Sequence, residues 1–536
     1  MAKRRRPRAA LAAAAAASST AVAMASTQHA AAAYDDLSMG GWNPAAGSAD
    51  ADLLPELETL LARSRDMARN NGLAAGATQT LKDNIIGAIL RLSAKPDWRL
   101  LGWTPERARE WSNLTEAKFR TWADTTECDA SREQTLHGLT LQALGGTLLN
   151  GDALALPLWL PRPGASWSTR LLMVEADRLR TPIGLQMRDD IRGGIERDRY
   201  GAPVAYYLTK RHPGDSWSLG IDPEHERVPA FTAWGRRRVL HLHDKERAGQ
   251  SRGKPIVTAV MREFHMAGKY ANTELQAAVS NSLIAAFLES DLSPEASANL
   301  FGEDPRAAWG QSLHQARNMR ELKGAAVIPL PVGARLSSFT PGRPNPSFEA
   351  FMLATLRHIA AGLNIPYELL VKDFSKTNYS SVRAALLEAW RYFNGRRRWL
   401  MDVWLRPIYE LWLEEAVNAG EIEAPGFYQN RHAYTRCRFI FGGKGWVDPV
   451  KEAQASVIRR NAHMSTLEME CAEQGLDYEE VIEQIAAEQA LMRRAGIEIA
   501  PMAATRPSGG ARTGFGQPGS NADEEEDEEA RQEAAA

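Results

Sequence analysis

The chain has 536 residues and 44% of them are hydrophobic, so it is long enough to build roughly two to four packed units. Lys and Arg total 64 against 66 Asp and Glu, which excludes the global basic excess by which proteins hold nucleic acid tightly. The three cysteines, Cys128, Cys437 and Cys471, are far apart and odd in number. They argue against a disulfide framework and a cysteine metal cluster, and they fit a reducing cytoplasm.

The N-terminal segment imitates a secretory signal peptide only in part. A basic run at residues 3–8 precedes an alanine-rich stretch at 9–25. Alanine contributes little apolar surface, so we expect residues 1–40 to form a flexible basic arm. An exported binding protein cleaved after Ala25 stays open as an alternative. No other segment reaches transmembrane length without a charge, so no membrane partner is expected.

Two helices and a small sheet are predicted in the first half of the chain. Residues 53–87 have a helical apolar repeat, which AsnAsnGly at 70–72 divides into two helices. Short β-type runs bounded by Pro and Gly follow at 171–175, 205–209 and 238–243. The pattern predicts a mixed domain.

A long helix is predicted from Pro255 to Glu289, because only Gly268 interrupts its apolar repeat. At ~1.5 Å per residue its roughly 34 residues extend about 50 Å. That length suits a bundle or a stalk better than a compact domain.

A small module is predicted after this helix. Two short helices begin at 293–295 and 304–305, and residues 325–329 and 334–339 form a strand pair. Helix then resumes and runs to Gly362. Two helices therefore bracket an inserted mixed module.

A polar loop separates two strongly helical segments near residue 370. Pro366 stops the first segment, and residues 372–379 carry cations, hydroxyls and two aromatic rings without any periodicity. An amphipathic helix begins past Ser381, and three arginines follow at 396–398. Its apolar stripe consists of Val382, Leu386, Leu387, Trp390 and Phe393.

Three short helices are predicted in residues 447–496. Ser465 and Glu468 form a capping box for the second of them, and Gly475 ends it. Residues 497–536, which contain a run of Asp and Glu, form a disordered acidic tail.

One motif suggests catalysis. GlyGlnSerArgGly at 249–253 matches the G-x-S-x-G nucleophile elbow and lies between a predicted strand and a predicted helix. Several residues separate it from the strand, whereas an elbow serine lies directly on a tight turn. A serine hydrolase that uses Ser251 with His241 or His243 is therefore the alternative function, and a Gly-rich connection is the ordinary explanation.

Metal and nucleotide sites are not expected. His241 and His243 point to one side of a predicted strand, but no third ligand is defined, so ordinary buried imidazoles are the simpler explanation. The chain has no G-x-x-x-x-G-K-[ST] phosphate loop and is not expected to hydrolyse ATP. No cofactor is expected.

Eight short blocks of sequence, spread over about 440 residues, together carry a resemblance to one protein family. The blocks lie at residues 41–44, 48–55, 68–76, 249–253, 367–370, 378–381, 395–398 and 468–479. In this order they resemble the lambda-type (lambdoid) tailed-phage portal proteins.

The resemblance implies an α+β, predominantly helical portal fold that forms a ring, whereas the residues alone predict only an elongated α+β protein with a stalk. The implied parts are a flexible arm (1–40), a wing with a helical start and a small β-sheet (41–254), a first stem helix (255–290), a clip (291–345), a second stem helix (346–363), a tunnel loop (364–380), a long backbone helix with a return strand to the wing (381–446), a helical crown (447–496) and a disordered acidic tail (497–536).

The resemblance also implies a structural, non-enzymatic function. The expected assembly is a dodecameric ring at one capsid vertex of the virion, assembled in the host bacterial cytoplasm. It would be a channel for double-stranded DNA packaging and ejection, and the nucleus of procapsid assembly on the major capsid or scaffold protein. The terminase large subunit would dock on the clip, and a head-tail connector protein would bind the ring.

The tunnel loop holds the expected DNA contacts. Lys372, Lys376, Asn378 and Tyr379 suit phosphate or stacking contacts, so any binding would be independent of sequence. Without the resemblance, a solvated surface loop is the ordinary explanation.

Overall fold

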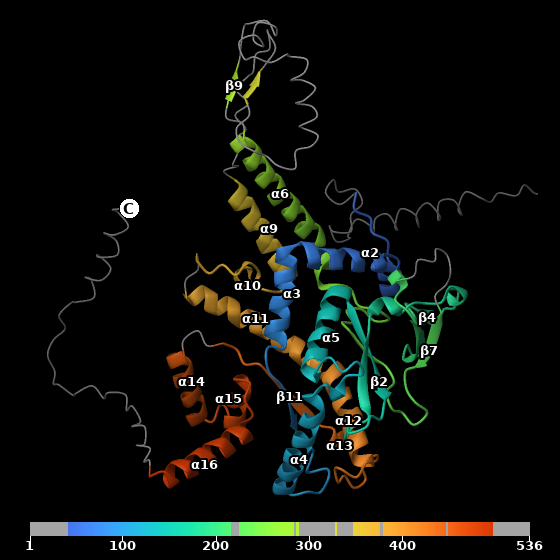
Figure 1. Ribbon diagram of the computed structural model, residues 1–536, viewed down its shortest axis with the longest axis vertical. Coiled ribbons are helices and arrows are strands. Elements are labelled where there is room, and N and C mark those ends of the chain that lie inside the picture. The colour runs from blue at the N-terminus through green and yellow to red at the C-terminus, as the bar shows by residue number, and fades with distance from the viewer. Residues whose placement is uncertain are drawn as a thin grey trace, which may run out of the picture. The chain divides into compact units, whose positions relative to one another are not determined.

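The computed structural model describes residues 41–215, 224–283, 286–288, 327–329, 347–375, 379–445 and 449–496. The chain divides into two compact units at Asp477 and Tyr478. The first unit holds nearly all the described elements (Figure 1). In the second unit the structure describes one helix, α16 (Tyr478–Arg494).

Two helices open the described chain. Helix α2 (Ala49–Asn70) begins at Ser48, whose hydroxyl accepts a hydrogen bond from the amide of Ala51 at 3.2 Å. Asn71 then ends α2 and caps α3 (Gly72–Ile85), because its side-chain oxygen accepts from the first amides of α3. The predicted division at 70–72 is confirmed.

Two antiparallel sheets follow. The first has the order β3 (Thr169–Val174), β2 (Asp152–Trp159), β8 (Leu240–His243), and the second β4 (Ile191–Arg192), β5 (Ile195–Arg197), β6 (Pro203–Thr209), β7 (His225–Pro229). Helix α5 (Leu136–Asn150) packs against β2 and β8. The three predicted β runs correspond to β3, β6 and β8, so the mixed domain is confirmed.

The chain returns to the N-terminal part through one strand pair. Strand β1 (Leu90–Ala94) pairs antiparallel with β11 (Cys437–Phe441). Helix α4 (Pro105–Ala123) packs on β1. Shorter elements complete the unit: 3₁₀ turns at Thr126–Cys128, Ala176–Arg178, Ile183–Leu185, Pro213–Asp215 and Ile256–Val260, and helix α13 at Arg431–Tyr434.

Aromatic side chains join α4 to α12 (Arg406–Asn418) at the centre of the core. Phe119 meets Trp412 edge to face with ring centroids 5.1 Å apart, and Trp167 lies at the same distance from Trp412. The buried Trp122 indole donates to the carbonyl of Thr169 at 2.8 Å. Such ring pairs add about 0.5–1.5 kcal/mol each beyond their burial, so this cluster ties the C-terminal half to the sheet.

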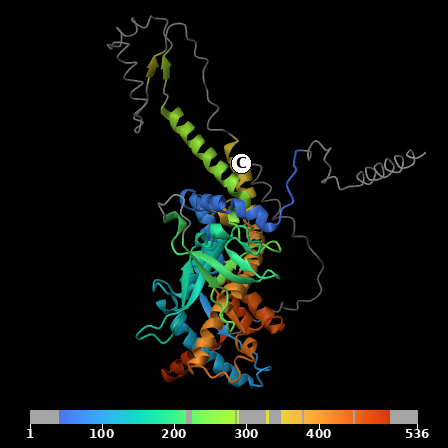
Figure 2. The same ribbon diagram turned by 90° about the vertical axis from the view of Figure 1, so that its right-hand side faces the viewer.

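Helices α6 (Met261–Leu283) and α9 (Phe348–Gly362) lie side by side and antiparallel (Figures 1 and 2). The ring of Tyr270 contacts Phe348 and Phe351 near the start of α9, at centroid distances of 5.3 and 5.4 Å. At the other end of the pair, a Cβ on Gly362 would meet the side chain of Val260.

Two expectations for this region are wrong. The helix predicted from Pro255 begins only at Met261, because residues 256–260 form a tighter 3₁₀ turn. Its predicted last residues instead form β9 (Ala286–Leu288), which pairs parallel with β10 (Val327–Pro329). Strand β10 was expected to pair with residues 334–339, which lie outside the described residues together with both predicted short helices.

The long helical segment of the C-terminal half is one run with an irregularity. Helix α11 (Tyr379–Leu400) continues through a π-helical turn at Met401–Leu405 into α12. Along the predicted stripe of α11, Phe393 is buried but Leu387 is 55% exposed. The π turn adds one residue to a helical turn and shifts the faces that follow it.

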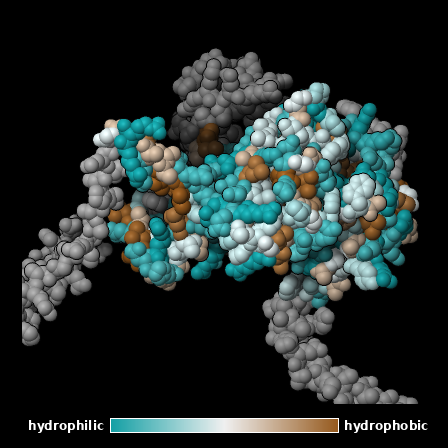
Figure 3. All heavy atoms as spheres, turned by 90° about the horizontal axis from the view of Figure 1, so that it is seen from below, coloured by the Kyte–Doolittle hydropathy of each residue, from teal (hydrophilic) through white to brown (hydrophobic). Residues whose placement is uncertain are grey.

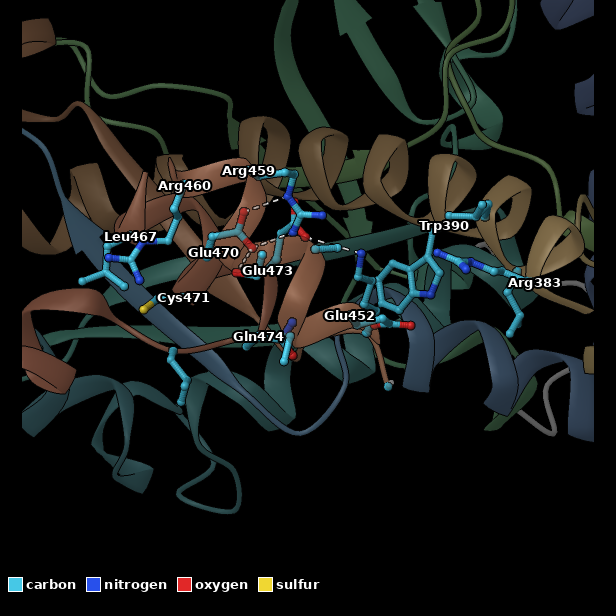
Figure 4. A pocket seen from close by; sticks show the side chains of 18 residues that line it. Arg383, Trp390, Glu452, Arg459, Arg460, Leu467, Glu470, Cys471, Glu473 and Gln474 are labelled. Carbon is cyan, nitrogen blue, oxygen red and sulfur yellow. Dashed lines mark hydrogen bonds and ion pairs between the residues drawn. The ribbon is translucent and has the colours of Figure 1, made fainter. Parts of the chain in front are cut away.

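Helices α14 (Pro449–Asn461) and α15 (Leu467–Glu473) pack beside α11 around a cavity of about 330 Å³ (Figure 4). The predicted capping box is wrong, because Thr466 caps α15 and accepts from the amide of Met469. Ser465 instead donates a hydrogen bond to the Glu470 carboxylate, which also accepts hydrogen bonds from Arg459 and Ser456. These hydrogen bonds, that of Arg459 first, lower the pKa of Glu470 to about 2.

The surface seen in Figure 3 carries small, separate hydrophobic patches among hydrophilic side chains. None of the helices within the described ranges combines the length and the apolar character that crossing a bilayer requires.

Two glycines hold the junction between the first sheet and the helices. Gly151 ends α5 in the left-handed region, with φ of 79°, and lies against the backbone of Gly253. A Cβ on Gly253 would lie 1.8 Å from the Gly151 carbonyl oxygen. Side chains are therefore excluded from this contact between two backbones.

We predict that Gly253→Ala destabilises the protein by more than about 3 kcal/mol, because the added methyl group meets backbone atoms that cannot move independently. Chemical denaturation followed by tryptophan fluorescence measures the loss. Gly395→Ala in α11 is the control, since nothing lies within 4 Å of its Cβ position, and it should be neutral or stabilise by up to about 1 kcal/mol. A Gly253→Ala variant as stable as the parent chain would refute the close contact.

Candidate functional site

The segment before α11 contains a short helix, α10, with one left-handed residue on each side of it. Helix α10 (Tyr367–Val371) is only five residues long, and its buried Leu370 anchors the segment to α3. Asn364 before α10 has φ of 55° and Lys372 after it has φ of 60°. Left-handed backbone is unusual for a lysine and ends the helix abruptly, so the chain changes direction at Lys372.

Residues 372–375 form a compact polar turn. The Asp373 carboxylate accepts hydrogen bonds from the Ser375 amide at 3.0 Å and from its hydroxyl at 2.7 Å. Lys372 is exposed, and the ring of Phe374 is 46% exposed. The turn thus presents a cation and an aromatic ring to solvent.

The structure places the predicted DNA-facing residues only in part. Lys372 lies in the turn described above, whereas Lys376 and Asn378 lie outside the described residues. Tyr379 is the first residue of α11. A shared surface of these four side chains therefore stays a prediction.

Arg397 fastens α11 to the rest of the fold. Its guanidinium donates to the carbonyls of Ile85, Asn84 and Gly442 at 2.7, 3.0 and 2.7 Å. The first two are terminal carbonyls of α3, where a cation also interacts favourably with the helix dipole. Burial lowers the pKa of Arg397 to about 10, so it remains charged at neutral pH.

The neighbouring arginines have separate partners, which the sequence did not indicate. Arg396 pairs with Asp244 beyond strand β8, and Arg398 pairs with Asp402 one helical turn further along. The three consecutive arginines therefore do not form one basic patch. A run of like charges on a helix points in different directions, and only the surrounding fold decides which of them is buried.

The GlyGlnSerArgGly segment is a structural junction. Ser251 is fully buried, and its hydroxyl donates to the Asp50 carboxylate at 2.6 Å, while its amide donates to the other carboxylate oxygen at 2.7 Å. Asp50 lies in the first turn of α2. Ser251 therefore links the start of α2 to the segment that precedes α6.

Arg252 forms a buried ion pair with Asp152 at the start of β2. Its guanidinium also donates to the carbonyls of Leu179 and Ala176 at 2.8 and 2.9 Å. Burial by itself raises the pKa of Asp152, but the charge of Arg252 and hydrogen bonds from His241 and Arg252 outweigh it and hold that pKa below its usual range.

The two candidate histidines belong to the same junction. His241 contacts Asp152 at 3.3 Å, and the ring of His243 stacks on it with centroids 4.2 Å apart, so both point to one side of β8 as expected. Burial lowers both pKa values, that of His243 to about 3. Ser251 pairs with Asp50 and His241 with Asp152, so the predicted nucleophile and base have different partners.

Metal binding gains no support from this geometry. Across the described ranges, no group of three or more His, Cys, Asp or Glu side chains is placed to hold a metal ion. The site consists of a polar turn that follows α10 and precedes α11. Arg397 binds α11 to the end of α3.

Comparisons with known proteins agree with the sequence blocks. The family model for the phage portal protein, lambda family, matches residues 35–397. Portal protein B of Escherichia phage lambda is 31% identical over 487 residues, which cover 88% of this chain and 91% of that protein. The portal protein of Escherichia phage N15 is 31% identical over 478 residues, 85% of this chain and 88% of the relative.

Solved structures similar to this chain come from gene transfer agent particles. Chains from the neck of an empty gene transfer agent particle and from the virion of the native particle are 14% identical to this chain. Both matches cover 78% of this chain. The neck chain is matched over 94% of its length with a TM-score of 0.39, and the virion chain over 93% with a TM-score of 0.38. The family model spans well over half of the chain, and with the identity to two portal proteins it shows that this protein belongs to the lambda family of phage portal proteins.

Proposed function

We propose that the protein is a structural portal that closes into a ring at one capsid vertex and conducts double-stranded DNA during packaging and ejection. Family membership over residues 35–397 is the observation that carries this proposal. Twelve copies form the ring, which also nucleates procapsid assembly in the host cytoplasm. A chain used in this way works as a conduit and not as a catalyst.

Exposed apolar side chains support assembly. Met266, Leu275 and Val279 on α6 are 55%, 62% and 41% exposed, and Phe351 on α9 is 57% exposed. Large apolar side chains on neighbouring helices stabilise the protein when a partner covers them. A head-to-tail contact that closes as a ring repeats one such interface around the symmetry axis.

Each part of the portal corresponds to particular elements of the chain. Helices α6 and α9 form the stem, and residues 291–345 form the clip, on which the terminase large subunit docks and supplies the energy for DNA movement. The two sheets belong to the wing and α14 to α16 to the crown. Head-tail connector and capsid or scaffold proteins bind the assembled ring.

The loop at 364–380 faces the channel and touches DNA through Lys372, Lys376, Asn378 and Tyr379. The near balance of 64 basic and 66 acidic residues suits sliding, because every lasting phosphate contact must break at each step. Contacts with phosphates are independent of sequence, as a packaging channel requires.

Imaging tests the assembly directly. Twelve copies of the 59.1 kDa chain have a mass of roughly 709 kDa. Mass photometry should find this species, and single-particle images should show a ring with an open axis wide enough for duplex DNA. A chain that stays monomeric under capsid-assembly conditions, or a ring whose central channel is closed, would refute the proposal.

We predict that Lys372→Ala with Lys376→Ala leaves ring assembly intact and lowers DNA packaging or retention at least about tenfold, because a short loop contributes little to the core but faces the duplex. A packaging assay on purified procapsids measures the effect.

Lys210→Ala with Lys245→Ala, two exposed lysines outside the loop, is the matched control and should package normally. Loss of the ring in the loop variant would place Lys372 or Lys376 in the subunit interface instead.

Ser251→Ala separates the portal from the hydrolase alternative. Its loss of the Asp50 hydrogen bond should lower stability by about 1–3 kcal/mol while packaging by assembled rings continues. Thermal unfolding and the packaging assay measure the two effects. Covalent labelling of Ser251 by a serine-directed probe would favour the hydrolase.

A further inference from the structure

A cavity of about 360 Å³ lies beside the π turn, and cations dominate its walls. Two of them, Arg398 and Arg406, stand on either side of Met401–Leu405. Lys95 follows strand β1, and Arg436 and Arg438 lie at the start of β11. Within the described part of the chain, no carboxylate lines this cavity.

Backbone pairing brings these cations together from three distant parts of the chain. Ala94 of β1 pairs antiparallel with Cys437 of β11, the amide of Lys95 donates to the carbonyl of Arg436 at 3.0 Å, and Arg438 lies opposite Ser93. The carboxylate of Asp402, inside the π turn, lies 2.8 Å from Arg398 and 2.9 Å from Arg406 and holds both arginines on this side of the helix. π turns within long helices are frequent at functional sites.

The cations of the cavity form ion pairs with carboxylates that lie outside its wall. Asp402 pairs with two arginines, Asp97 with Arg436 at 3.2 Å, and Glu468 with Lys95 and Arg438 at 3.4 and 3.5 Å. Glu410 also acts on Cys437 through its charge. The carboxylate of Glu116 also lies close, because it accepts a hydrogen bond from the amide of Ala94 at 2.6 Å. These carboxylates are outside the wall, so the side chains that line the cavity are mainly cations.

The rest of the cavity wall adds no negative charge. Met401 and Cys437 are each 7% exposed and supply apolar surface. Burial raises the pKa of Cys437 to about 12, so its thiol stays neutral. The five cations reach solvent, with side-chain exposures from 34% for Lys95 and Arg406 to 69% for Arg398.

We propose that this cavity binds phosphate groups. Guanidinium groups match phosphate oxygens with two parallel hydrogen bonds, and four of the five cations here are arginines. The carboxylates that now pair with the cations at the surface contribute little, so an incoming phosphate can replace or share them.

Two sources carry this chemistry, a free polyphosphate such as pyrophosphate and the backbone of a nucleic acid. The inference rests on the geometry of the cavity alone and holds whether or not the ring conducts DNA. Its failure is therefore distinguishable from failure of the proposed function.

The test titrates the full-length protein with sodium pyrophosphate by isothermal titration calorimetry at constant ionic strength. The double variant Arg398→Gln with Arg438→Gln should weaken binding at least about tenfold, because each substitution removes a charged donor pair. The control, Arg188→Gln with Arg391→Gln, removes two exposed, ion-paired arginines away from the cavity and should bind like the parent chain. The single variant Arg438→Gln, checked by circular dichroism, covers the case in which the double variant does not fold.

A labelled 20-base-pair duplex distinguishes the sources. If the cavity variants also lose the duplex and pyrophosphate competes with it, the occupant is a nucleic-acid backbone. If only pyrophosphate binding falls, the occupant is a free polyphosphate. Absence of pyrophosphate binding by the parent chain up to about 5 mM, or equal binding by the folded cavity variants, overturns the proposal.

Discussion

The buried ion pair between Arg252 and Asp152 is the constraint on which the rest of the structure depends. Removing either partner would leave an uncompensated buried charge, at a typical cost of about 3–5 kcal/mol. Around the pair, Gly151 and Gly253 bring two backbones into contact, and Ser251 holds the start of α2. One short segment thus sets the positions of the sheet, α2 and the helix that leads into the proposed stem.

A second constraint, at Arg397, governs the loop. A loop keeps a defined position only when the elements that carry it are rigid. Arg397 supplies this rigidity because it satisfies carbonyls of α3 and of the chain after β11 with one buried guanidinium. The polar turn at Lys372 to Ser375 follows α10, whose buried Leu370 holds it against α3.

Local signals predicted well wherever the determinants lie close together in the chain. Asn71 both ends α2 and caps α3, and the β runs were found from their own alternation and flanking turns. Predictions failed where distant residues compete with local preference. The last residues of the predicted long helix instead form β9, which pairs with the distant strand β10. The capping box failed for a local reason: Ser465 donates to Glu470, five residues further along, and Thr466 caps α15. Spacing alone likewise could not show that Ser251 belongs to Asp50.

The sequence by itself determined the α+β class, the division between α2 and α3, the strands β3, β6 and β8, and the family, because periodicity, caps and short sequence blocks are properties of neighbouring residues. Tertiary structure decided which charges are buried and which meet. Arg252 and Arg397 are structural while Arg398 and Arg438 line a cavity, although all four are similar arginines in sequence. Burial and charge pairing depend on contacts between segments hundreds of residues apart, and those contacts exist only once the chain has folded.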